Sequence, residues 1–253
     1  VRHHLNSGGL AFGQCLTAVG WVGGTLPEMY EPEGMVELPM ADVAGGGFVV
    51  GAALMGKRPI YIIRYQGFNW YNCISVLNYA CKSKEMWGVP CPMIVRSVGM
   101  EGSIGPVAGS SHHSLYYRMP GIKIYSPMTN KEYKSCYQDF MDSDDVFYIS
   151  EHRAAFANTE ELPDIEYDNP HICLFPISIT RFAAVEASKE LHKDDDYEDG
   201  ICSPMAHKLM MQAEGSRVYC MGLENKSAGF AKHLDNLPPS KDKIIQKVKQ
   251  EIS

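Results

Sequence analysis

Two absences limit what this chain can do. The sequence has no run of 18 or more apolar residues, so none of its segments is a candidate transmembrane helix. It also lacks an excess of positive charge, because the formal net charge is −7 at pH 7 and the lysines near the end are interleaved with Asp242 and Glu251. A negatively charged surface repels a phosphate backbone. We therefore expect no membrane and no nucleic acid among its partners.

The cysteines lack the spacing of a metal site. None of the eight forms a C-x-x-C pair, and no histidines stand at zinc-binding spacing. Most lie in apolar segments, where a free cysteine packs as a small hydrophobic side chain. We expect neither a disulfide framework nor a metal held by this chain. Because residues 1–9 show no signal-peptide pattern, the sequence predicts a soluble protein of a reducing compartment, the cytoplasm or an organelle matrix.

Apolar runs typical of buried strands alternate with helical segments along the first part of the chain. Strands that are apolar along their whole length are typical of a mostly parallel sheet with helices on both faces, so we predict a three-layer α/β domain. The predicted strands are 15–21, 59–65, 92–97, 122–126 and 146–150, and the predicted helices are 43–55, 71–86 and 130–141.

A second, smaller α/β domain is predicted after an acidic, proline-bearing stretch. The predicted division is a first domain at 1–155, a linker at 156–170 and a second domain at 171–253. In the second domain we predict strands at 171–176 and 217–222 and helices from Ser178 or Thr180 to 191, at 204–212 and at 240–252.

The segment from Pro39 to Pro59 joins one acidic residue to a glycine-rich apolar helix. Asp42 comes just before the apolar run, as an N-cap residue does. Five glycines follow within fifteen residues, and each costs roughly 1 kcal/mol relative to alanine in an ordinary helix. They indicate that a backbone or a ligand approaches the helix closely. Asp42 is therefore either a helix cap or a functional carboxylate.

The same segment resembles the pyrimidine-binding half-site of thiamine-diphosphate enzymes. It is most similar to the β subunit of the decarboxylating component of 2-oxo acid dehydrogenases, whose pattern is Pro, an aliphatic residue, Ser, Glu, a Gly/Ala helix and Gly-x-Arg-Pro. The match from Pro39 to Pro59 has no gap. The resemblance covers roughly residues 14–252 and includes the aromatic turn at 60–69 and the histidine loop at 109–114. It implies a pyrimidine-binding domain followed by a domain like the C-terminal domain of transketolases.

The resemblance implies which residues contact the cofactor. In the family a glutamate at the position of Asp42 hydrogen-bonds the aminopyrimidine ring and promotes proton loss from the thiazolium. Phe68 lies 26 residues later, where the family places the aromatic side chain that stacks on the ring. Tyr65 and Trp70 are the alternatives. The implied cofactor contacts are Met40, Asp42, Tyr65 and Phe68.

The histidine loop implies a substrate-facing role. One of His112 and His113 is implied to donate a hydrogen bond to a carboxylate or a developing oxyanion, and the register slightly favours His112. Together with Asp42 these are the candidate catalytic residues. Residues 151–153, Glu-His-Arg, follow a predicted strand at the edge where open α/β sheets bind ligands. A salt bridge across the linker is the alternative interpretation of that run.

The chain does not contain Gly-Asp-Gly, with which the family begins its magnesium and diphosphate site. The resemblance therefore implies thiamine diphosphate and magnesium shared with an α-type partner subunit, in an α2β2 heterotetramer. The implied reaction is decarboxylation of a 2-oxo acid with acyl transfer, or ketol transfer from a ketose.

Two departures from the family pattern qualify this interpretation. Asp42 is one methylene shorter than the family glutamate, so the alternative is a non-catalytic structural or regulatory subunit that retains the fold. In addition, the second domain is shorter than in the family, and a βα unit is missing from the sequence near residues 192–195.

Overall fold

The first part of the chain folds around six parallel strands. A computed structural model describes residues 1–17, 24–100, 105, 107–109, 111–162, 164–165, 173–193, 219, 221–222 and 237–252. The sheet has the order β2-β1-β3-β4-β6-β5, and every neighbouring pair is parallel. Its strands are β1 (Ala11–Gln14), β2 (Met35–Leu38), β3 (Ile60–Ile63), β4 (Met93–Gly99), β5 (Ile122–Tyr125) and β6 (Val146–His152).

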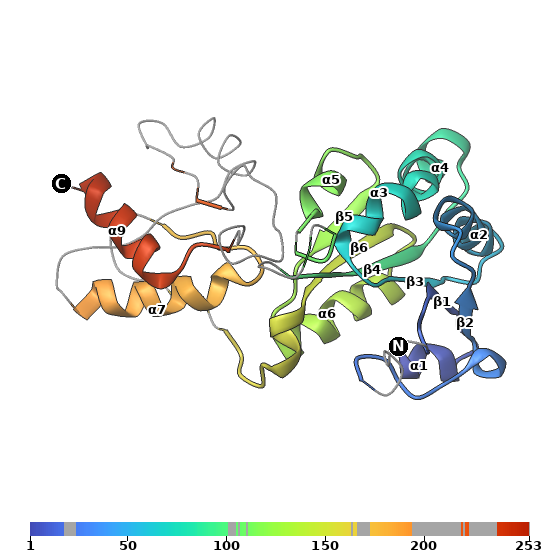
Figure 1. Cartoon of the computed structure of the whole chain (residues 1–253). Coiled ribbons are helices and arrows are strands. Elements are labelled where there is room, and N and C mark those ends of the chain that lie inside the picture. Colours follow the sequence, from blue (N-terminus) through green and yellow to red (C-terminus); the bar gives the residue numbers. More distant parts are fainter. Residues whose placement is uncertain are drawn as a thin grey trace.

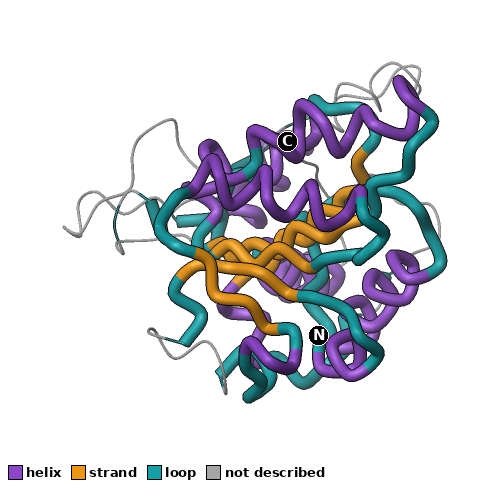
Figure 2. Tube along the Cα trace, turned by 90° about the vertical axis from the view of Figure 1, so that its right-hand side faces the viewer, coloured by secondary structure: helices purple, strands orange, loops and turns teal. Residues whose placement is uncertain are grey.

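Helices cover both faces of this sheet (Figures 1 and 2). One face carries α2 (Asp42–Leu54), α3 (Asn69–Asn72), α4 (Cys81–Trp87) and α5 (His113–Tyr117), with a π-helical turn at Val76–Ala80. The other face carries α1 (Arg2–Asn6) and α6 (Asn130–Met141). Short 3-10 turns lie at Glu31–Glu33, Gln66–Phe68 and Arg153–Ala157. This confirms the predicted three-layer α/β domain, with an all-parallel sheet.

Alternate side chains of each strand enter opposite layers of the core. In β3, Tyr61 and Ile63 belong to the apolar layer with α2, whereas Ile60 and Ile62 belong to the layer that contains α1 and α6. This follows from the two-residue period of a strand. Because both layers are apolar, β3 is apolar throughout and β4 and β6 are largely so, which is why the sequence revealed these strands.

The first strand lies earlier than the sequence predicted. The prediction was 15–21, but β1 ends at Gln14, because Cys15 has a left-handed backbone (φ 56°) that stops the strand. Residues 18–21 of the predicted strand lie outside the described residues. β2 and α1 were not predicted.

The helix predicted at 71–86 is also not continuous. It is replaced by α3, the π-helical turn and α4, and α3 ends at Asn72. In contrast, α6 has the predicted bounds, and α2 lies within one residue of its prediction.

In the C-terminal part, α7 (Thr180–Lys193) packs on α9 (Lys241–Ile252) through Ala184, Ala187, Leu191, Ile244 and Val248. Both helices were predicted. The described part of the strand predicted at 171–176 contains only a single bridge residue, Phe175, so that prediction is wrong over 173–176.

Two other predictions for this region, the helix at 204–212 and the shortening beyond Lys193, lie outside the described residues. Of the strand predicted at 217–222, the described residues 219, 221 and 222 do not form a strand, and 217, 218 and 220 lie outside the described residues. The division into 1–155, 156–170 and 171–253 stays a prediction. Across the described ranges, every helix is too short or too polar to cross a membrane.

Candidate functional site

The carboxyl ends of β1 and β3 enclose a cavity of about 50 Å³. Ligands of open α/β sheets bind at this edge. The lining comes from the ends of the two strands, the turn after β2, the 3-10 turn before α3 and the last residue of α3. It consists of Gln14, Cys15, Met40, Ile62, Ile63, Arg64, Phe68 and Asn72.

Asp42 is the first residue of α2, and it is half-buried. The N-cap position belongs to Ala41, and no side chain caps this helix end, so the interpretation of Asp42 as an N-cap is wrong. Its carboxylate instead accepts a hydrogen bond at Oδ1 from Asn72 Nδ2, at 2.7 Å. Asp42 is therefore tied to the cavity through a residue that lines it.

Asn72 is a site residue that the sequence did not reveal. It is buried, and its Nδ2 also donates to the carbonyl of Phe68 at 3.1 Å. Its Oδ1 accepts a hydrogen bond from the Tyr61 hydroxyl. The pKa of Tyr61 lies well above its ordinary value because the side chain is buried, so this hydroxyl keeps its proton at neutral pH.

Phe68 lines the cavity and is half-buried, and it also packs against the core under α2. Tyr65 lies beside it, with ring centroids 6.4 Å apart. Met40 lies across the cavity, where it is 70% exposed and its Sδ contacts Cys15 Sγ at 3.5 Å. The structure thus brings Met40 and Phe68 to one cavity, whereas Tyr65 contacts Phe68 without lining the cavity.

Two donors at this cavity have no partner. Gln14 Nε2 and Arg64 Nε are buried, and neither finds a hydrogen-bond acceptor within the described part of the chain. A buried donor without a partner costs roughly 1–3 kcal/mol. A ligand that offers acceptor atoms beside an aromatic ring would remove this cost. The aminopyrimidine of thiamine diphosphate is a flat ring with such atoms, so the residues present fit it.

The two histidines stand at the start of α5. The backbone N–H of His112 donates to Gln66 Oε1 at 2.6 Å. The His112 ring packs edge to face with the Trp70 ring, with their centroids 5.9 Å apart. Both histidines are half-buried. Burial lowers the pKa of His112 below its ordinary value of 6.5, so the ring is neutral at pH 7. Neither histidine lines the 50 Å³ cavity.

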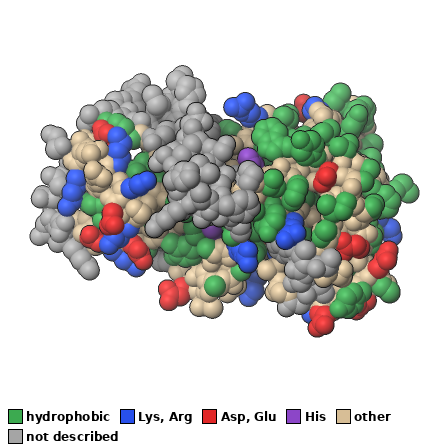
Figure 3. Space-filling view, viewed as in Figure 1, with side chains coloured by type: hydrophobic (Ala, Val, Ile, Leu, Met, Phe, Trp, Pro, Cys, Tyr) green, Lys and Arg blue, Asp and Glu red, His purple; other side chains and the backbone are tan. Residues whose placement is uncertain are grey.

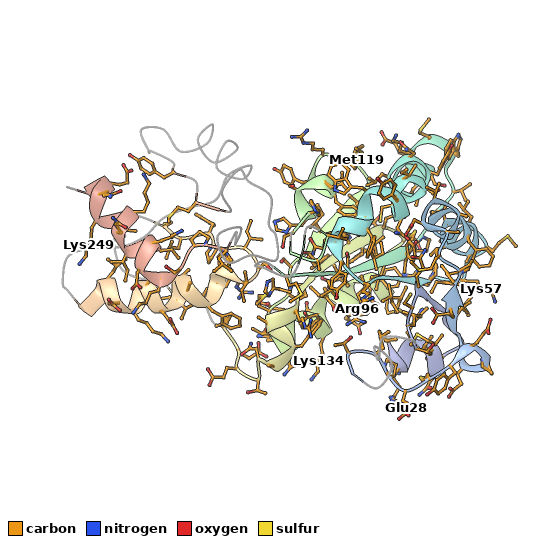
Figure 4. The ribbon with its side chains drawn as sticks, viewed as in Figure 1. Glu28, Lys57, Arg96, Met119, Lys134 and Lys249 are labelled. Carbon is orange, nitrogen blue, oxygen red and sulfur yellow. The ribbon has the colours of Figure 1, made fainter. Side chains whose placement is uncertain are left out.

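Of the run 151–153, the glutamate is a structural residue. Glu151 on β6 pairs with Arg96 on β4, with Nε donating to Oε1 at 2.8 Å and Nη2 at 2.7 Å from Oε2. Arg96, labelled in Figure 4, lies inside the domain. The pair joins two neighbouring strands. The alternative interpretation of this run, a salt bridge across the linker, is therefore wrong for Glu151. It borders a second cleft of about 310 Å³ on the α6 face.

Comparison with known proteins identifies the family to which the first part of the chain belongs. Residues 21–158, more than half of the chain, match the family described as "Transketolase, pyrimidine binding domain". The 2-oxoisovalerate dehydrogenase subunit beta of Bacillus subtilis is 25% identical over 194 residues, which are 67% of this chain and 56% of that protein. The pyruvate dehydrogenase E1 component subunit beta of Rickettsia conorii is 25% identical over 143 residues, 54% of this chain and 43% of that protein.

Solved structures share the fold. A transketolase from Campylobacter jejuni superposes with a TM-score of 0.73 at 14% identity, over 98% of this chain and 46% of that chain. A "split gene transketolase, inactive beta4 tetramer" gives a TM-score of 0.57, also at 14% identity, over 78% of this chain and 66% of that chain. The chain spans about half the length of the curated relatives it matches. The chain belongs to the transketolase pyrimidine-binding domain family and is a distant relative of 2-oxo acid dehydrogenase β subunits and transketolases.

Proposed function

We propose that this chain supplies the pyrimidine-side half of a thiamine-diphosphate site in an enzyme that acts on a 2-oxo acid or a ketose. The observation that carries the proposal is the carboxylate of Asp42, tied through Asn72 to a cavity that Phe68 and Met40 line. Asp42 and Phe68 stand at the spacing at which the family places its acid and its stacking aromatic residue. Two of the curated relatives are subunits named for 2-oxo acid dehydrogenases.

Each residue has a separate task in this proposal. Phe68 and Met40 hold the aminopyrimidine, and Gln14 Nε2 supplies a hydrogen-bond donor at the cavity wall. The Asp42 carboxylate would hold or release a proton for a nitrogen of that ring. When bound, thiamine diphosphate supplies the group that accepts the electron pair of a broken carbon–carbon bond.

One of His112 and His113 faces the substrate in this proposal. Because the His112 ring is neutral at pH 7, it can donate a single hydrogen bond to a substrate carboxylate or an oxyanion without carrying charge into the site. The edge of the Trp70 ring limits how the His112 ring can turn.

The site is completed by a partner in this proposal. Magnesium and the diphosphate are held by an α-type subunit, and two such pairs form an α2β2 heterotetramer. Supporting this, large hydrophobic side chains are exposed on α2, α3 and α4, and Figure 3 shows hydrophobic atoms gathered on that part of the molecule. Extended apolar surface of this kind marks protein interfaces.

A non-catalytic subunit is the second candidate, and the short Asp42 side chain favours it. One solved structure of this fold is titled an inactive β4 tetramer. A chain that retains the fold and the interface without turnover would regulate or stabilise a complex.

The substitution Asp42→Asn tests the proposed function. The full chain is purified with the subunit that co-purifies with it, and turnover of pyruvate, a branched 2-oxo acid and a ketose phosphate is measured with thiamine diphosphate and magnesium. We expect kcat to fall by roughly 10²-fold or more, because the proton acceptor is lost while the side-chain volume is kept. Unchanged turnover in the variant would refute the catalytic role. No turnover in the wild-type complex would favour the non-catalytic subunit.

A further inference from the structure

Asp42 does not itself line the cavity, and within the described residues its side-chain hydrogen bond goes to Asn72, which does. We infer that Asn72 is a positioning residue that holds the Asp42 carboxylate toward the cofactor ring and so makes up for a side chain one methylene shorter than glutamate. This inference rests on the proposed function.

The chemistry of its neighbours fixes the orientation of the Asn72 amide. Its Nδ2 faces two groups that only accept hydrogen bonds, the Asp42 carboxylate at 2.7 Å and the Phe68 carbonyl at 3.1 Å. Its Oδ1 faces the Tyr61 hydroxyl, which donates. The reverse orientation would place an amide oxygen against a carboxylate, so the N–H group must point to Asp42.

Tyr61 in turn holds the amide in place. Its ring lies in β3 under α2 and is 1% exposed, so it cannot turn away from Asn72 without disturbing the core. Since its hydroxyl remains protonated, it donates to Asn72 throughout the neutral pH range. The chain of contacts therefore runs from the sheet, through Asn72, to the start of α2.

Only one of the two Asp42 oxygens is used in this contact. A carboxylate offers two acceptor oxygens, so the second can interact with a ligand nitrogen while the first is held. A short acid fixed by one oxygen loses less orientational freedom when a ligand arrives than a long acid that is not fixed.

The test uses the full chain in complex with its co-purifying subunit. In Asn72→Ala we expect kcat to fall by about ten- to a hundredfold, since a shift of about 1 Å in a catalytic group can cost that much. We expect a smaller change in the KM for thiamine diphosphate. In Asp42→Asn/Asn72→Ala we expect no further loss beyond Asp42→Asn alone, because Asn72 acts through Asp42.

A second readout needs no turnover. In the full chain labelled with ¹⁵N, the side-chain amide resonance of Asn72 is assigned as the one lost in Asn72→Ala. We expect its proton resonance to move upfield in Asp42→Ala, because the carboxylate acceptor is gone. An unmoved resonance would show that the contact does not form.

Asn69 provides the matched control. It is equally buried and lies in the same helix, but its amide bonds Tyr148 and Ser97 rather than Asp42. Asn69→Ala should lower the midpoint of unfolding without the loss of kcat that Asn72→Ala shows.

If Asn72→Ala fails to fold, Tyr61→Phe tests the inference instead, because it removes only the hydroxyl that holds the Asn72 amide. We expect Tyr61→Phe to lower kcat several-fold when Asp42 is present. In the Asp42→Asn variant, we expect Tyr61→Phe to cause no further loss of kcat.

The outcomes separate the inference from the proposed function. Full activity in Asp42→Asn refutes the proposed function. Loss of activity in Asp42→Asn, together with full activity in Asn72→Ala or in a folded Tyr61→Phe, refutes this inference alone. Equal losses of kcat in Asn72→Ala and Asn69→Ala would assign both residues to stability rather than positioning.

Discussion

Glycine at position 46 decides how closely α2 approaches α3. A Cβ atom built there would lie 2.0 Å from the carbonyl oxygen of Asn72, which no real contact allows. Gly46 also lies one turn after Asp42, on the same face of α2. The glycine-rich helix predicted a close backbone approach, and at this position the approaching backbone belongs to α3.

The substitution Gly46→Ala should destabilise the chain and misplace the site. We expect a loss of about 1–3 kcal/mol, because the added methyl forces α2 and α3 apart. The measurement is urea unfolding of the full chain followed by circular dichroism. Gly51→Ala is the control, since its Cβ would meet nothing within 4 Å and alanine favours the helix. If both variants are equally stable, the close approach is not required.

At the residue scale, the sequence indicated the site only in part. Asp42 and Phe68 could be named because they belong to one short segment with recognisable spacing. Asn72 could not, because its role depends on a contact with Asp42, 30 positions earlier in the sequence, across the α2–α3 interface. Gln14 was missed because its importance lies in a donor that lacks a partner, which no sequence pattern shows.

At the scale of helices and strands, prediction from the sequence succeeded where a capping residue and the apolar pattern mark the same end of an element. The bounds of α6 were correct because Thr129 caps it, with its hydroxyl oxygen accepting from the Glu132 N–H at 3.4 Å. β2 was missed because it is four residues long and contains the exposed Glu37. The error at β1 arose because the apolar run continues past Cys15, whereas the strand stops at the left-handed backbone there.

The Arg96–Glu151 pair joins β4 to β6 inside the sheet. The two side chains are 5% and 2% exposed. Removing one member of a buried ion pair leaves a charge without its partner in the interior, which typically costs 3–5 kcal/mol. The pair therefore matters for stability where β4 and β6 border the second cleft.

We predict that Glu151→Gln lowers the free energy of unfolding by about 3 kcal/mol or more, because Arg96 keeps its charge. Chemical denaturation of the full chain measures this. The control is Glu190→Gln, which removes the exposed pair with Lys241 and should change the stability little. A Glu151→Gln variant as stable as the Glu190→Gln variant would mean that Arg96 finds other acceptors.

On the scale of the whole molecule, one face carries more than half of the large exposed hydrophobic side chains among the described residues. This apolar face belongs to α2, α3, the π-helical turn and α4, which pack side by side. Its residues are Val43, Phe48, Leu54, Met55, Trp70, Tyr71, Ile74, Tyr79, Met86 and Trp87. Exposed apolar area on this scale is unfavourable in water, so we expect it to be covered in the assembled protein.

The double substitution Met55→Glu/Trp87→Glu tests this expectation. The two side chains are 81% and 55% exposed, so the charges should not disturb the fold of the chain alone. We expect the unmodified chain to associate with itself in sedimentation velocity when no partner is present. The variant should sediment as a monomer and fail to retain the co-purifying subunit, because buried charges without partners oppose an interface.

Met141→Glu is the matched control for this face. Met141 is 44% exposed at the end of α6, on the opposite side of the sheet, so its substitution should leave assembly unchanged. A wild-type chain that sediments as a monomer and binds thiamine diphosphate and magnesium tightly by itself would contradict the shared site. If assembly is unchanged in Met55→Glu/Trp87→Glu, the interface lies on another surface, because two charges within a buried apolar interface would weaken the complex.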